Sequence, residues 1–521
     1  MTMQDFTSRL PRNLYSAARV QQLDRVAIDE LGIAGFKLMQ IAGKAAFNAL
    51  LERWPQANRL IVFTGAGNNG GDGYIIAGLA REQGFSVNIV QVGNESALSS
   101  DAKLAHRYAV ERSASMIEFS EFESELQFGH PNSVIVDALL GTGLDRDVAG
   151  NYQLAIDCIN ASGLPVLAID IPSGLNADTG IAMGSTVVAA VTVTFIGMKQ
   201  GLLTGQGRDF AGTVIFNNLD VPDEVYTRDS SPPPSACRID INYVTQFLAP
   251  RTRSSHKGKH GHVLVIGGDY GYGGAALMAA EAAQRAGAGL VSVLTRSAHR
   301  PAYLARRPEL MVLGTEDEDA GIEALLARAD VIAIGPGLGR SQWSRKLLQL
   351  ALGAQVSANT PLVVDADALN LLSERVGSGA PSKRENWILT PHPGEAAALL
   401  SCAVTEIQAD RFWAVAELNK RWGGCCLLKG SGSLICAANA DQPIYLCTEG
   451  NAGMASGGMG DVLSGVAASL VAQGMTLTQS LCSAVCIHGE AADLAMAAGG
   501  QRGMVATDLL PFIRQLVNPS L

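Results

Sequence analysis

The chain has 521 residues, which is too long for a single hydrophobic core, so we expect at least two domains. Hydrophobic residues make up 47% of the chain and charged residues 17%, a composition typical of a well-buried enzyme and not of a disordered protein. The net charge is −10 and no long Lys/Arg cluster occurs, which argues against nucleic acid as a partner.

The N-terminal half begins with helical periodicity in residues 16–31 and 36–51. Short apolar strands then alternate with helical segments; the strands are predicted at 60–64, 87–92, 133–137, 166–170 and 191–195. This alternation predicts a parallel sheet with helices on both faces, which is a Rossmann-like three-layer α/β domain.

The segment Y-T-R-D-S-S-P-P-P-S-A-C-R, residues 226–238, is the least compatible with regular structure. Three successive prolines beside serines cannot join a helix or a central strand. We therefore predict a first domain over residues 1–225, a linker over 226–240 and a second domain over 241–521.

The C-terminal half repeats the α/β pattern, with strands predicted at 262–267, 290–294, 331–335, 362–366, 387–390 and 425–429. No charged residue lies between Asp461 and His488, but glycines and polar residues interrupt this stretch. It predicts two packed helices of a soluble protein and no membrane span. The N-terminus lacks the apolar core of a signal peptide, and the nine cysteines show no metal-binding spacing, so we expect a cytoplasmic protein with reduced thiols.

The first candidate site is T-G-A-G-N-N-G-G-D-G, which follows the strand that ends at Thr64. Gly65, Gly67 and Gly70 fit the dinucleotide-binding spacing G-x-G-x-x-G, and a helix is expected to begin near Asp72. Amide N–H groups in such a turn, together with the helix dipole, bind phosphate. A redox Rossmann domain needs an acidic residue about 20 positions further on, and only Glu95, which is late, is present.

Polar residues end the neighbouring strands of this half. Asp137 ends one strand and is followed by A-L-L-G-T-G-L-D-R; Asp170 ends the next and is followed by I-P-S-G-L. Because ligands of parallel sheets bind at the carboxyl ends of the strands, Asn69, Asp137, Asp170 and Ser173 are expected near one crevice. Amide and hydroxyl oxygens with a single carboxylate suit a monovalent cation better than Mg²⁺.

The stretches G-N-N-G-G-D-G, D-A-L-L-G-T-G-L and D-I-P-S-G-L resemble the NAD(P)H-hydrate epimerase family over most of residues 15–220. In that family the dinucleotide is the substrate, with a nicotinamide ring hydrated at C6. The resemblance implies K⁺ binding by Asn69, Asp137 and Ser173. Asp137 is the candidate for proton transfer, although the sequence does not separate a base from a cation ligand. The substrate-binding residues that the resemblance implies are Asn68, Asn69, Gly70, Gly71, Asp72, Gly141, Thr142, Gly143, Leu144, Asp145, Arg146, Asp147 and Asp170.

The second candidate site is E-G-N-A-G-M-A-S-G-G-M-G-D-V-L-S-G, residues 449–465, ahead of a helix expected to start at Val462. A glycine-rich turn at a helix N-terminus supplies amide donors for a transferring phosphoryl group. Asp461 lies where it could take a proton from an attacking hydroxyl. The chain has no G-x-x-x-x-G-K-[ST] motif and is therefore not a P-loop enzyme.

Other strand ends of this half carry related motifs. K-G-S-G-S, residues 429–433, offers a cation and hydroxyls for nucleotide phosphates, and T-P-H-P-G-E fixes His392 between two prolines. G-P-G-L-G and G-G-D-Y-G-Y-G-G-A, residues 335–339 and 267–275, add two glycine loops. Asp365 and Asp367 are metal-facing or capping groups, and their spacing does not decide between these roles.

These motifs, in this order over residues 250–515, resemble the ribokinase-like fold and within it the ADP- or ATP-dependent NAD(P)H-hydrate dehydratase family. The resemblance implies hydrated-nicotinamide binding by Ala275, Gly337, His392 and Asp461. It implies Mg²⁺ in this domain and ADP or ATP as co-substrate. The nucleotide-binding residues would be Lys429, Gly430, Ser431, Gly432, Ser433 and Gly460.

The two resemblances together predict a bifunctional repair enzyme in which Asp461 and Asp137 are the catalytic residues. It would phosphorylate the C6 hydroxyl of hydrated NAD(P)H and eliminate phosphate, and it would epimerise the R and S hydrates. The alternatives are a dehydrogenase, a ribokinase-like small-molecule kinase with a nucleotide-binding N-terminal domain, and a non-catalytic nucleotide sensor. We expect small-molecule substrates, no nucleic acid or membrane partner, and a homo-oligomer.

Overall fold

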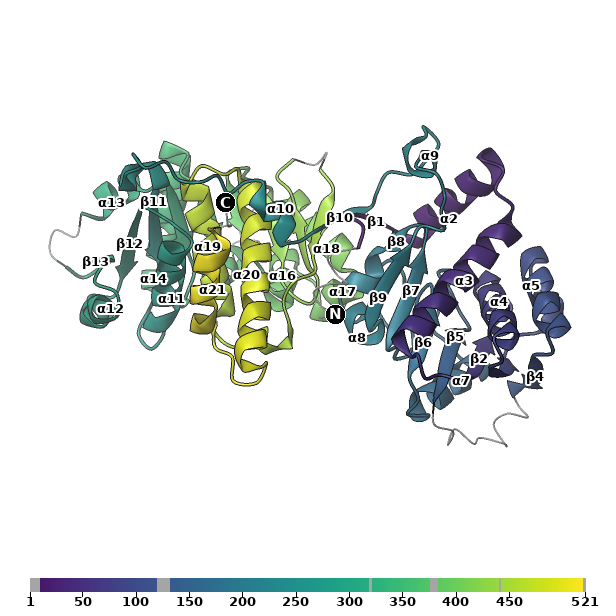
Figure 1. Cartoon of the computed structure of the whole chain (residues 1–521). Helices are drawn as coiled ribbons and strands as arrows, with labels where there is room; N and C mark the ends of the chain where they lie inside the picture. The colour runs from purple at the N-terminus through teal and green to yellow at the C-terminus, as the bar shows by residue number, and fades with distance from the viewer. Residues whose placement is uncertain (1–9, 120–131, 318–320, 375–382, 440–441, 519–521) are drawn as a thin grey trace. The chain divides into compact units, whose positions relative to one another are not determined.

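The computed structural model describes residues 10–119, 132–317, 321–374, 383–439 and 442–518. The chain divides into two compact units, Met1–Cys237 and Arg238–Leu521. Each unit is an α/β structure built on a largely parallel sheet (Figure 1), which confirms the predicted fold class. All eleven predicted strands are present within a residue or two of their expected bounds.

The N-terminal unit contains a seven-stranded parallel sheet in the order β4-β3-β2-β5-β6-β7-β9. Its strands are β2 (Arg59–Thr64), β3 (Ser86–Gln91), β4 (Ser115–Glu118), β5 (Ser133–Ala138), β6 (Val166–Ile169), β7 (Val191–Phe195) and β9 (Thr213–Asn217). The central strands are apolar on both faces because helices cover both sides of the sheet.

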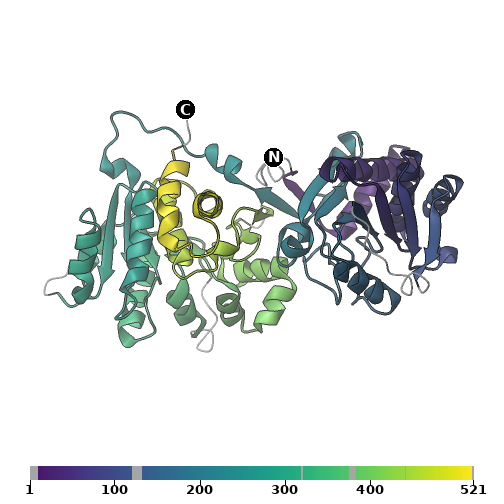
Figure 2. The same ribbon diagram turned by 60° about the horizontal axis from the view of Figure 1, so that its bottom comes forward.

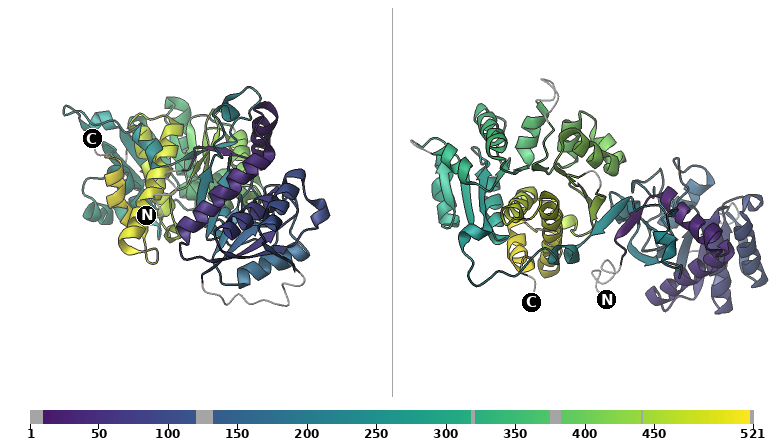
Figure 3. Two further views of the ribbon diagram at one scale, coloured as in Figure 1. Left: turned by 45° about the vertical axis from the view of Figure 1, so that its right-hand side comes forward. Right: turned by 90° about the horizontal axis from the view of Figure 1, so that it is seen from above.

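One face of this sheet packs against α2 (Ala17–Arg25), α3 (Gly35–Arg53), α4 (Asn68–Glu82) and α5 (Ser100–Glu111). The other face packs against α7 (Asn151–Ala161). Figure 3 shows this three-layer arrangement from a second side. The predicted helix over 16–31 is α2 followed by one stretch of π-helix, Val26–Glu30. Smaller elements complete the unit: β1 (Asn13–Tyr15), β8 (Met198–Lys199), α8 (Gly207–Phe210) and α9 (Glu224–Thr227).

The segment predicted as a linker is not free of structure. The strand β10 (Ala236–Ile239) lies at its end, and Leu14 and Asn13 of β1 pair antiparallel with Ala236 and Cys237. The tandem prolines lie before this strand, where no ladder hydrogen bond is needed. The sequence could not indicate the pairing because the partner strand is more than 200 residues away.

The C-terminal unit has seven parallel strands continued by two antiparallel ones. Its order is β13-β12-β11-β14-β15-β16-β17-β18-β19, with β18 and β19 antiparallel to their neighbours. The strands are β11 (His262–Ile266), β12 (Leu290–Thr295), β13 (Met311–Gly314), β14 (Val331–Ile334), β15 (Leu362–Val364), β16 (Trp387–Leu389), β17 (Cys425–Leu428), β18 (Ser433–Cys436) and β19 (Ile444–Cys447). Although β13 is also parallel, neither it nor the antiparallel pair was predicted.

Helices from distant parts of the chain cover this sheet. Figure 2 shows the last three helices, in yellow, lying together beside the strands. They are α19 (Met459–Ala472), α20 (Leu477–Gly499) and α21 (Leu509–Leu516), and α11 (Gly273–Arg285) packs against α19. The remaining helices are α10 (Ile241–Thr245), α12 (Arg300–Arg306), α13 (Ile322–Arg328), α14 (Gln342–Ala358), α15 (Ala366–Ser373), α16 (Pro393–Leu400), α17 (Val404–Ala409) and α18 (Arg411–Trp422).

By length and composition, α20 is apolar enough to cross a membrane. Yet 67% of its most apolar window is buried within the protein, where it packs against α19 and α21. The helix therefore has the surroundings of a core helix, in agreement with the two packed helices predicted for this stretch.

Candidate active sites

The N-terminal unit has a cavity of about 870 Å³ at the carboxyl ends of its strands. The two glycine-rich segments predicted to hold a nucleotide, at the start of α4 and after β5, both line this cavity. The predicted residues on its wall are Asn68, Asn69, Asp72, Gly141, Thr142, Gly143, Leu144, Asp145, Arg146, Asp147 and Asp170.

The helix after β2 starts earlier than the sequence indicated. α4 begins at Asn68 and not near Asp72, so Gly70 and Gly71 lie in its first turn and are not among the cavity-lining residues. A Cβ on Gly70 would lie 2.1 Å from the carbonyl oxygen of Gly65, and one on Gly65 would lie 1.9 Å from that of Leu139. Only glycine fits at these two positions, because the backbone after β2 lies in contact with the loop after β5. This close contact explains why glycines occupy the first turn of α4 although glycine has a low helix propensity.

Asn69 and Ser173 both bond the backbone of Leu140, and Asp137 bonds Ser173 and the Leu139 amide, so these three side chains lie close together. Asn69 Nδ2 donates to the Leu140 carbonyl at 3.1 Å, and the Leu140 amide donates to Ser173 Oγ at 2.8 Å. Ser173 donates to both carboxylate oxygens of Asp137, from Oγ at 2.6 Å and from its amide at 2.8 Å. Asn69 Oδ1 is buried and has no hydrogen-bond partner among the residues that the structure describes.

Asp137 lies behind the cavity wall, with no exposed surface. Burial raises the pKa of its carboxyl to about 6, although the hydrogen bonds from Ser173 and Leu139 lower it. A carboxylate in this position can hold a cation or brace the loop, but it does not face the cavity directly.

A second group of charges does line the cavity. The buried ammonium of Lys199 donates to Asp170 Oδ1, which also accepts from Thr194 Oγ1 and the Phe195 amide at 3.3 Å. Asp170 has a left-handed backbone, with φ of 66°, which a non-glycine residue adopts at a cost and which is often seen at functional sites.

Asp24 of α2 and Asp72 of α4 complete this group. Burial, and then the charge of Asp170, raises the pKa of Asp72 well above its usual range. Burial raises the pKa of Asp24 to about 6, while Lys199 lowers it and Asp170 raises it. The cavity therefore combines an ion pair with two carboxyl groups that retain protons at higher pH than usual.

Sequence reasoning missed Lys199 and Asp24. Lys199 is the one charged residue between Asp178 and Arg208, a stretch otherwise composed of apolar, small and neutral polar residues. A lone lysine in such a stretch is rarely buried without a partner, and this signal could have identified it. Asp24 carries no comparable signal, because α2 is an amphipathic helix with several charged residues.

In the C-terminal unit, Asp461 lies in the first turn of α19. This helix begins at Met459, three residues before the expected start. The preceding Gly458 has φ of 92°, which places it in the left-handed region favoured by glycine. The turn therefore brings Gly460 and Asp461 to the N-terminus of a buried helix, as the glycine pattern indicated.

Lys429, which is 20% exposed, and the buried Asp365 form an ion pair beneath this turn. Lys429 Nζ lies 2.8 Å from Asp365 Oδ1 and 3.9 Å from Glu395 Oε2. A Cβ on Gly460 would lie 3.2 Å from Lys429 Nζ and 3.4 Å from Asp365 Oδ2, so both groups approach the helix start closely. Asp365 is therefore an ion-pair partner of Lys429, an alternative that the sequence did not suggest.

Asp461 lies within the field of these charges. Its pKa is raised to about 7, by burial first and by the charge of Asp365 second, while Lys429 lowers it. Glu395 behaves similarly: burial raises its pKa to about 7 against the lowering by Lys429. A carboxyl group that titrates near neutral pH can both accept and return a proton, as a general base must.

His392 caps α16 as well as facing this group. Its Nδ1 accepts from the amides of Gly394 and Glu395 at 3.0 and 3.3 Å, while its own amide donates to Glu395 Oε2 at 2.8 Å. Burial and the charge of Lys429 lower the pKa of His392, which keeps the imidazole neutral. The ring thus has a capping role, and 56% of its side chain stays exposed.

Ala275 and Gly337 come from the two remaining glycine loops and lie together. A Cβ on Gly337 would be 3.0 Å from that of Ala275, and Gly337 has a positive φ of 58°. Asp367 joins these loops to the Asp365 region, because its Oδ2 accepts from the Gly339 amide at 2.8 Å. Asp367 therefore has a loop-bracing contact.

Arg411 donates hydrogen bonds to the backbone of the segment 429–433 and of the residue before it. This contact of Arg411 was not predicted from the sequence. This buried side chain lies within 3.5 Å of the carbonyl oxygens of Leu428, Lys429 and Gly432. Burial lowers its pKa to about 10. Ser433 Oγ donates to the Gly430 carbonyl at 3.1 Å, so this hydroxyl braces its own loop.

Comparison with known proteins assigns each half to a described family. Residues 263–515 match the family described as NAD(P)H-hydrate dehydratase, and residues 35–201 match the family described as YjeF-related protein N-terminus. The chain is 45% identical over 506 residues to the bifunctional NAD(P)H-hydrate repair enzyme Nnr of Coxiella burnetii, covering 97% of this chain and 99% of that protein.

A second relative is the bifunctional NAD(P)H-hydrate repair enzyme Nnr of Escherichia coli, 41% identical over 521 residues, with 100% of this chain and 97% of that protein covered. Among solved structures, the ADP/ATP-dependent NAD(P)H-hydrate dehydratase of Bacillus subtilis, co-crystallised with ATP and Mg²⁺, is 27% identical. It covers 53% of this chain and 95% of that one, with a TM-score of 0.46.

Proposed function

The chain belongs to the family of bifunctional NAD(P)H-hydrate repair enzymes, and we propose that its two compact units each carry one of the two reactions. The protein is an enzyme that acts on small molecules. It epimerises the R and S forms of hydrated NAD(P)H and dehydrates the S form to NAD(P)H. This explains the fusion, because spontaneous hydration gives both epimers at C6 and a chiral dehydratase site accepts one.

Epimerisation belongs to the N-terminal unit in this proposal. The support is the cavity of about 870 Å³, which is large enough for a dinucleotide portion and has two glycine-rich loops on its wall. The start of α4 offers amide N–H groups and the positive end of a helix dipole to the pyrophosphate. The dinucleotide motif found in the sequence thus holds a substrate and no redox cofactor.

Proton movement at C6 is assigned to groups that face the cavity. Asp170 and Lys199 form an ion pair on the wall, and Asp24 and Asp72 lie in their field. The sequence predicts Asp137 as the group for this step, but its carboxylate is fully buried and is not among the cavity-lining residues. We therefore favour the alternative role of Asp137, that of a cation ligand, and place proton transfer at the Asp170–Lys199 pair.

The residues around Leu140 fit a K⁺ ion. Asn69 Oδ1 is a buried oxygen without a partner, and the Asp137 carboxylate and Ser173 hydroxyl converge on the same backbone segment. Oxygen donors with one negative charge are the ligand set expected for a weakly held monovalent cation. When bound, K⁺ would neutralise the buried carboxylate and stabilise nearby substrate oxygens.

Dehydration belongs to the C-terminal unit. Asp461 would take the proton of the C6 hydroxyl while the oxygen attacks the terminal phosphoryl group of ADP, which leaves AMP. Loss of phosphate from C6 and of a proton from C5 then restores the ring double bond. A phosphate leaves far more readily than a hydroxide, so the nucleotide converts a slow elimination into a fast one.

The segment 429–433 and Gly460 are proposed to hold the adenine nucleotide, with Ala275, Gly337 and His392 around the hydrated ring. Lys429 has an added role, since it offsets the charges of Asp365 and Glu395. Asp365 accepts hydrogen bonds from Lys429 and Ser464, so it offers few free oxygens to a metal. We propose ADP or ATP as the donor; Mg²⁺, when bound, would screen the negative charge of the nucleotide phosphates.

The single observation that carries the dehydratase assignment is a carboxyl group with a pKa of about 7 at a glycine-rich helix start. The test is incubation of the purified protein with hydrated NADH, ADP and Mg²⁺, while the near-ultraviolet absorbance of the dihydronicotinamide ring is followed. Recovery of both epimers with release of AMP and phosphate is expected. Recovery without nucleotide, or nucleotide consumption without recovery, would contradict the proposal.

Two broader expectations belong to the same proposal. All nine cysteines are free thiols in the structure, which suits the reducing cytoplasm. A homo-oligomer stays a prediction, and sedimentation analysis of the purified chain tests it.

A further inference from the structure

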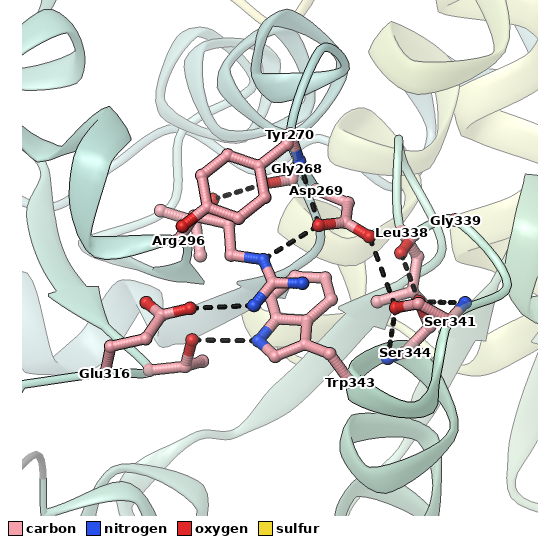
Figure 4. A network of polar contacts seen from close by, with 12 residues as sticks. Gly268, Asp269, Tyr270, Arg296, Glu316, Leu338, Gly339, Ser341, Trp343 and Ser344 are labelled. Atoms are coloured by element: carbon pink, nitrogen blue, oxygen red, sulfur yellow. Dashed lines mark hydrogen bonds and ion pairs between the residues drawn. The ribbon is translucent and has the colours of Figure 1, made fainter.

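A stacked arginine lies beside the glycine loop that follows β11 in the C-terminal unit (Figure 4). The guanidinium carbon of Arg296 lies 4.7 Å from the ring centre of Tyr270 and 4.1 Å from that of Trp343. Contact with two aromatic rings suits the planar guanidinium of arginine better than the compact ammonium of lysine.

Two carboxylates complete the surroundings of Arg296. Its Nε donates to Asp269 Oδ1 and its Nη1 to Glu316 Oε1, each at 2.8 Å. Burial raises the pKa of both acids, but their hydrogen bonds lower it overall, and for Glu316 to about 2. Arg296 thus joins the loop after β11, the loop after β13 and the start of α14, while itself following β12.

The contacts continue from this arginine to the proposed ring-binding residues. Asp269 Oδ2 accepts from Ser341 Oγ at 3.3 Å, and the Asp269 amide donates to the Gly337 carbonyl at 2.7 Å. Gly337 in turn lies against Ala275 and against Tyr272, whose carbonyl would be 2.4 Å from a Cβ on Gly337. The two loops meet so closely that a shift in one displaces the other.

Other residues fix the ends of the same loop. Thr295 Oγ1 donates to the Gly268 carbonyl at 2.9 Å, and Tyr303 donates to the Gly273 carbonyl. These bonds anchor residues 268 and 273 but not the middle of the loop. Arg296 holds the middle, at Asp269 and Tyr270.

We propose that Arg296 is a positioning residue for binding of the hydrated nicotinamide, acting through Asp269 on Gly337 and Ala275. The inference rests on the proposed dehydratase function and extends it beyond the motif residues. Arg296 does not need to touch the substrate. It sets the separation of two loops whose backbones form one wall of the ring-binding region.

The test compares Arg296→Met with Arg296→Lys and with a matched control, Arg300→Met. Arg300 is a neighbouring surface arginine whose Nη1 pairs with Asp317 Oδ2 at 2.8 Å. For each variant, KM for the hydrate, KM for ADP, kcat of dehydration, epimerase rate and thermal unfolding are measured. Ser341→Ala, which removes the Ser341–Asp269 bond together with the side-chain cap of α14 at Ser344, serves as a milder variant if Arg296→Met folds poorly.

We expect Arg296→Met to raise KM for the hydrate by about 10- to 100-fold, because misplacement of a binding loop by about 1 Å has effects of this size. KM for ADP and the epimerase rate should stay near wild type. Arg296→Lys should recover part of the loss, since it keeps the charge near Asp269 and Glu316 but loses the stacking. Arg300→Met should match wild type.

The inference is overturned if Arg296→Met leaves KM for the hydrate unchanged and lowers kcat only in proportion to the fraction of folded protein. Arg296 would then only stabilise the fold. An equal rise in both KM values would overturn the inference as well. A wild-type enzyme that fails to dehydrate the hydrate would instead remove the proposed function, and this inference with it.

Discussion

Lys429 Nζ donates to Asp365 Oδ1 at 2.8 Å, and Asp365 Oδ2 accepts from Ser464 Oγ at 2.6 Å. Burial lowers the pKa of Lys429, but the carboxylates of Asp365 and Glu395 raise it overall, so the ammonium is firmly charged. The pair joins the end of β17 to the end of β15 directly below Gly460. The electrostatics of the proposed base therefore depend on a lysine for which the sequence predicts only nucleotide binding.

Replacing Lys429 by Met should destabilise the C-terminal unit by about 3–5 kcal/mol, because removal of one partner leaves a buried charge unpaired. The free energy of unfolding in urea measures this loss. Lys420→Met is the matched control, since Lys420 is an exposed lysine that pairs with Glu417 at 3.2 Å, and surface pairs contribute about 0–1 kcal/mol. Equal stability of the two variants would contradict a structural role for the buried pair.

The pH dependence of dehydration should show a rising limb near pH 7. Asp461 must be ionised to accept a proton, and its pKa is raised to about 7 by burial first and by Asp365 second. The measurement is kcat/KM for the hydrate at saturating ADP. In Lys429→Met the limb should move to higher pH, because Lys429 lowers the pKa of Asp461. A limb that stays in place would point to ionisation of the nucleotide.

Asp461→Asn should abolish dehydration and leave epimerisation intact. Loss of a general base lowers the rate by about 10²- to 10⁴-fold. Asp137→Ala should do the reverse, since that residue lies in the other unit. If both activities vanished together in either variant, the two sites would not be independent.

The same Asn variant should be more stable than wild type at alkaline pH. The folded-state pKa of Asp461, about 7, lies above its usual 3.8, so the folded protein holds this proton more tightly than the unfolded chain. The stability that this group contributes is complete below the usual pKa and is lost as pH rises through about 7. Asp461→Asn does not lose stability in this way, because asparagine does not titrate. The free energy of unfolding, measured in denaturant at about pH 5 and pH 8, should therefore favour the variant over wild type more strongly at the higher pH.

The strands and the motif loops were predictable because they depend on local sequence. The central strands are buried on both faces and therefore read as apolar runs that end in a polar residue, as at Asp137 and Asp170. The antiparallel strands β18 and β19 were not predicted, because their runs are short and only partly buried. Their pairing also depends on neighbours that sequence alone does not reveal.

The site was predictable to the same extent. Glycine-rich turns and acidic strand ends made Asn69, Asp137, Ser173 and Asp461 candidates, because these signals depend on local sequence alone. The ion-pair partners of the charged groups could not be predicted. Lys199 and Asp170, and likewise Lys429 and Asp365, are far apart in sequence and come together only in the folded chain. Burial sets the pKa shifts of Asp72 and Asp461, and it too is a tertiary property.

Potassium should stabilise the N-terminal unit, and Asn69→Leu should remove that effect. A ligand that binds only the folded state raises stability by mass action, so the midpoint of thermal unfolding should rise with K⁺ concentration. Asn160→Leu is the control: Asn160 Nδ2 donates to the Thr186 carbonyl at 2.9 Å, on α7. The control should lose some stability and keep the K⁺ response. A wild-type midpoint that is equal in K⁺ and in Li⁺ would argue against the site.

The position of Asp461 also depends on close packing of α19 against α11. A Cβ on Gly465 would lie 2.0 Å from the Ala279 carbonyl oxygen. Because this oxygen belongs to the backbone of α11, the clash can be relieved only by a shift of one of the two helices. Gly465→Ala should therefore destabilise the C-terminal unit by about 1–3 kcal/mol, the usual effect of overpacking, and lower dehydratase kcat while epimerisation continues. Gly353→Ala, at an exposed position of α14 with no atom within 4 Å of the added Cβ, should instead stabilise the protein by up to about 1 kcal/mol. The midpoints of thermal unfolding and the dehydratase kcat are measured for both variants and for wild type. A Gly465→Ala protein as stable and active as wild type would show that α19 can move without displacing the turn that carries Asp461.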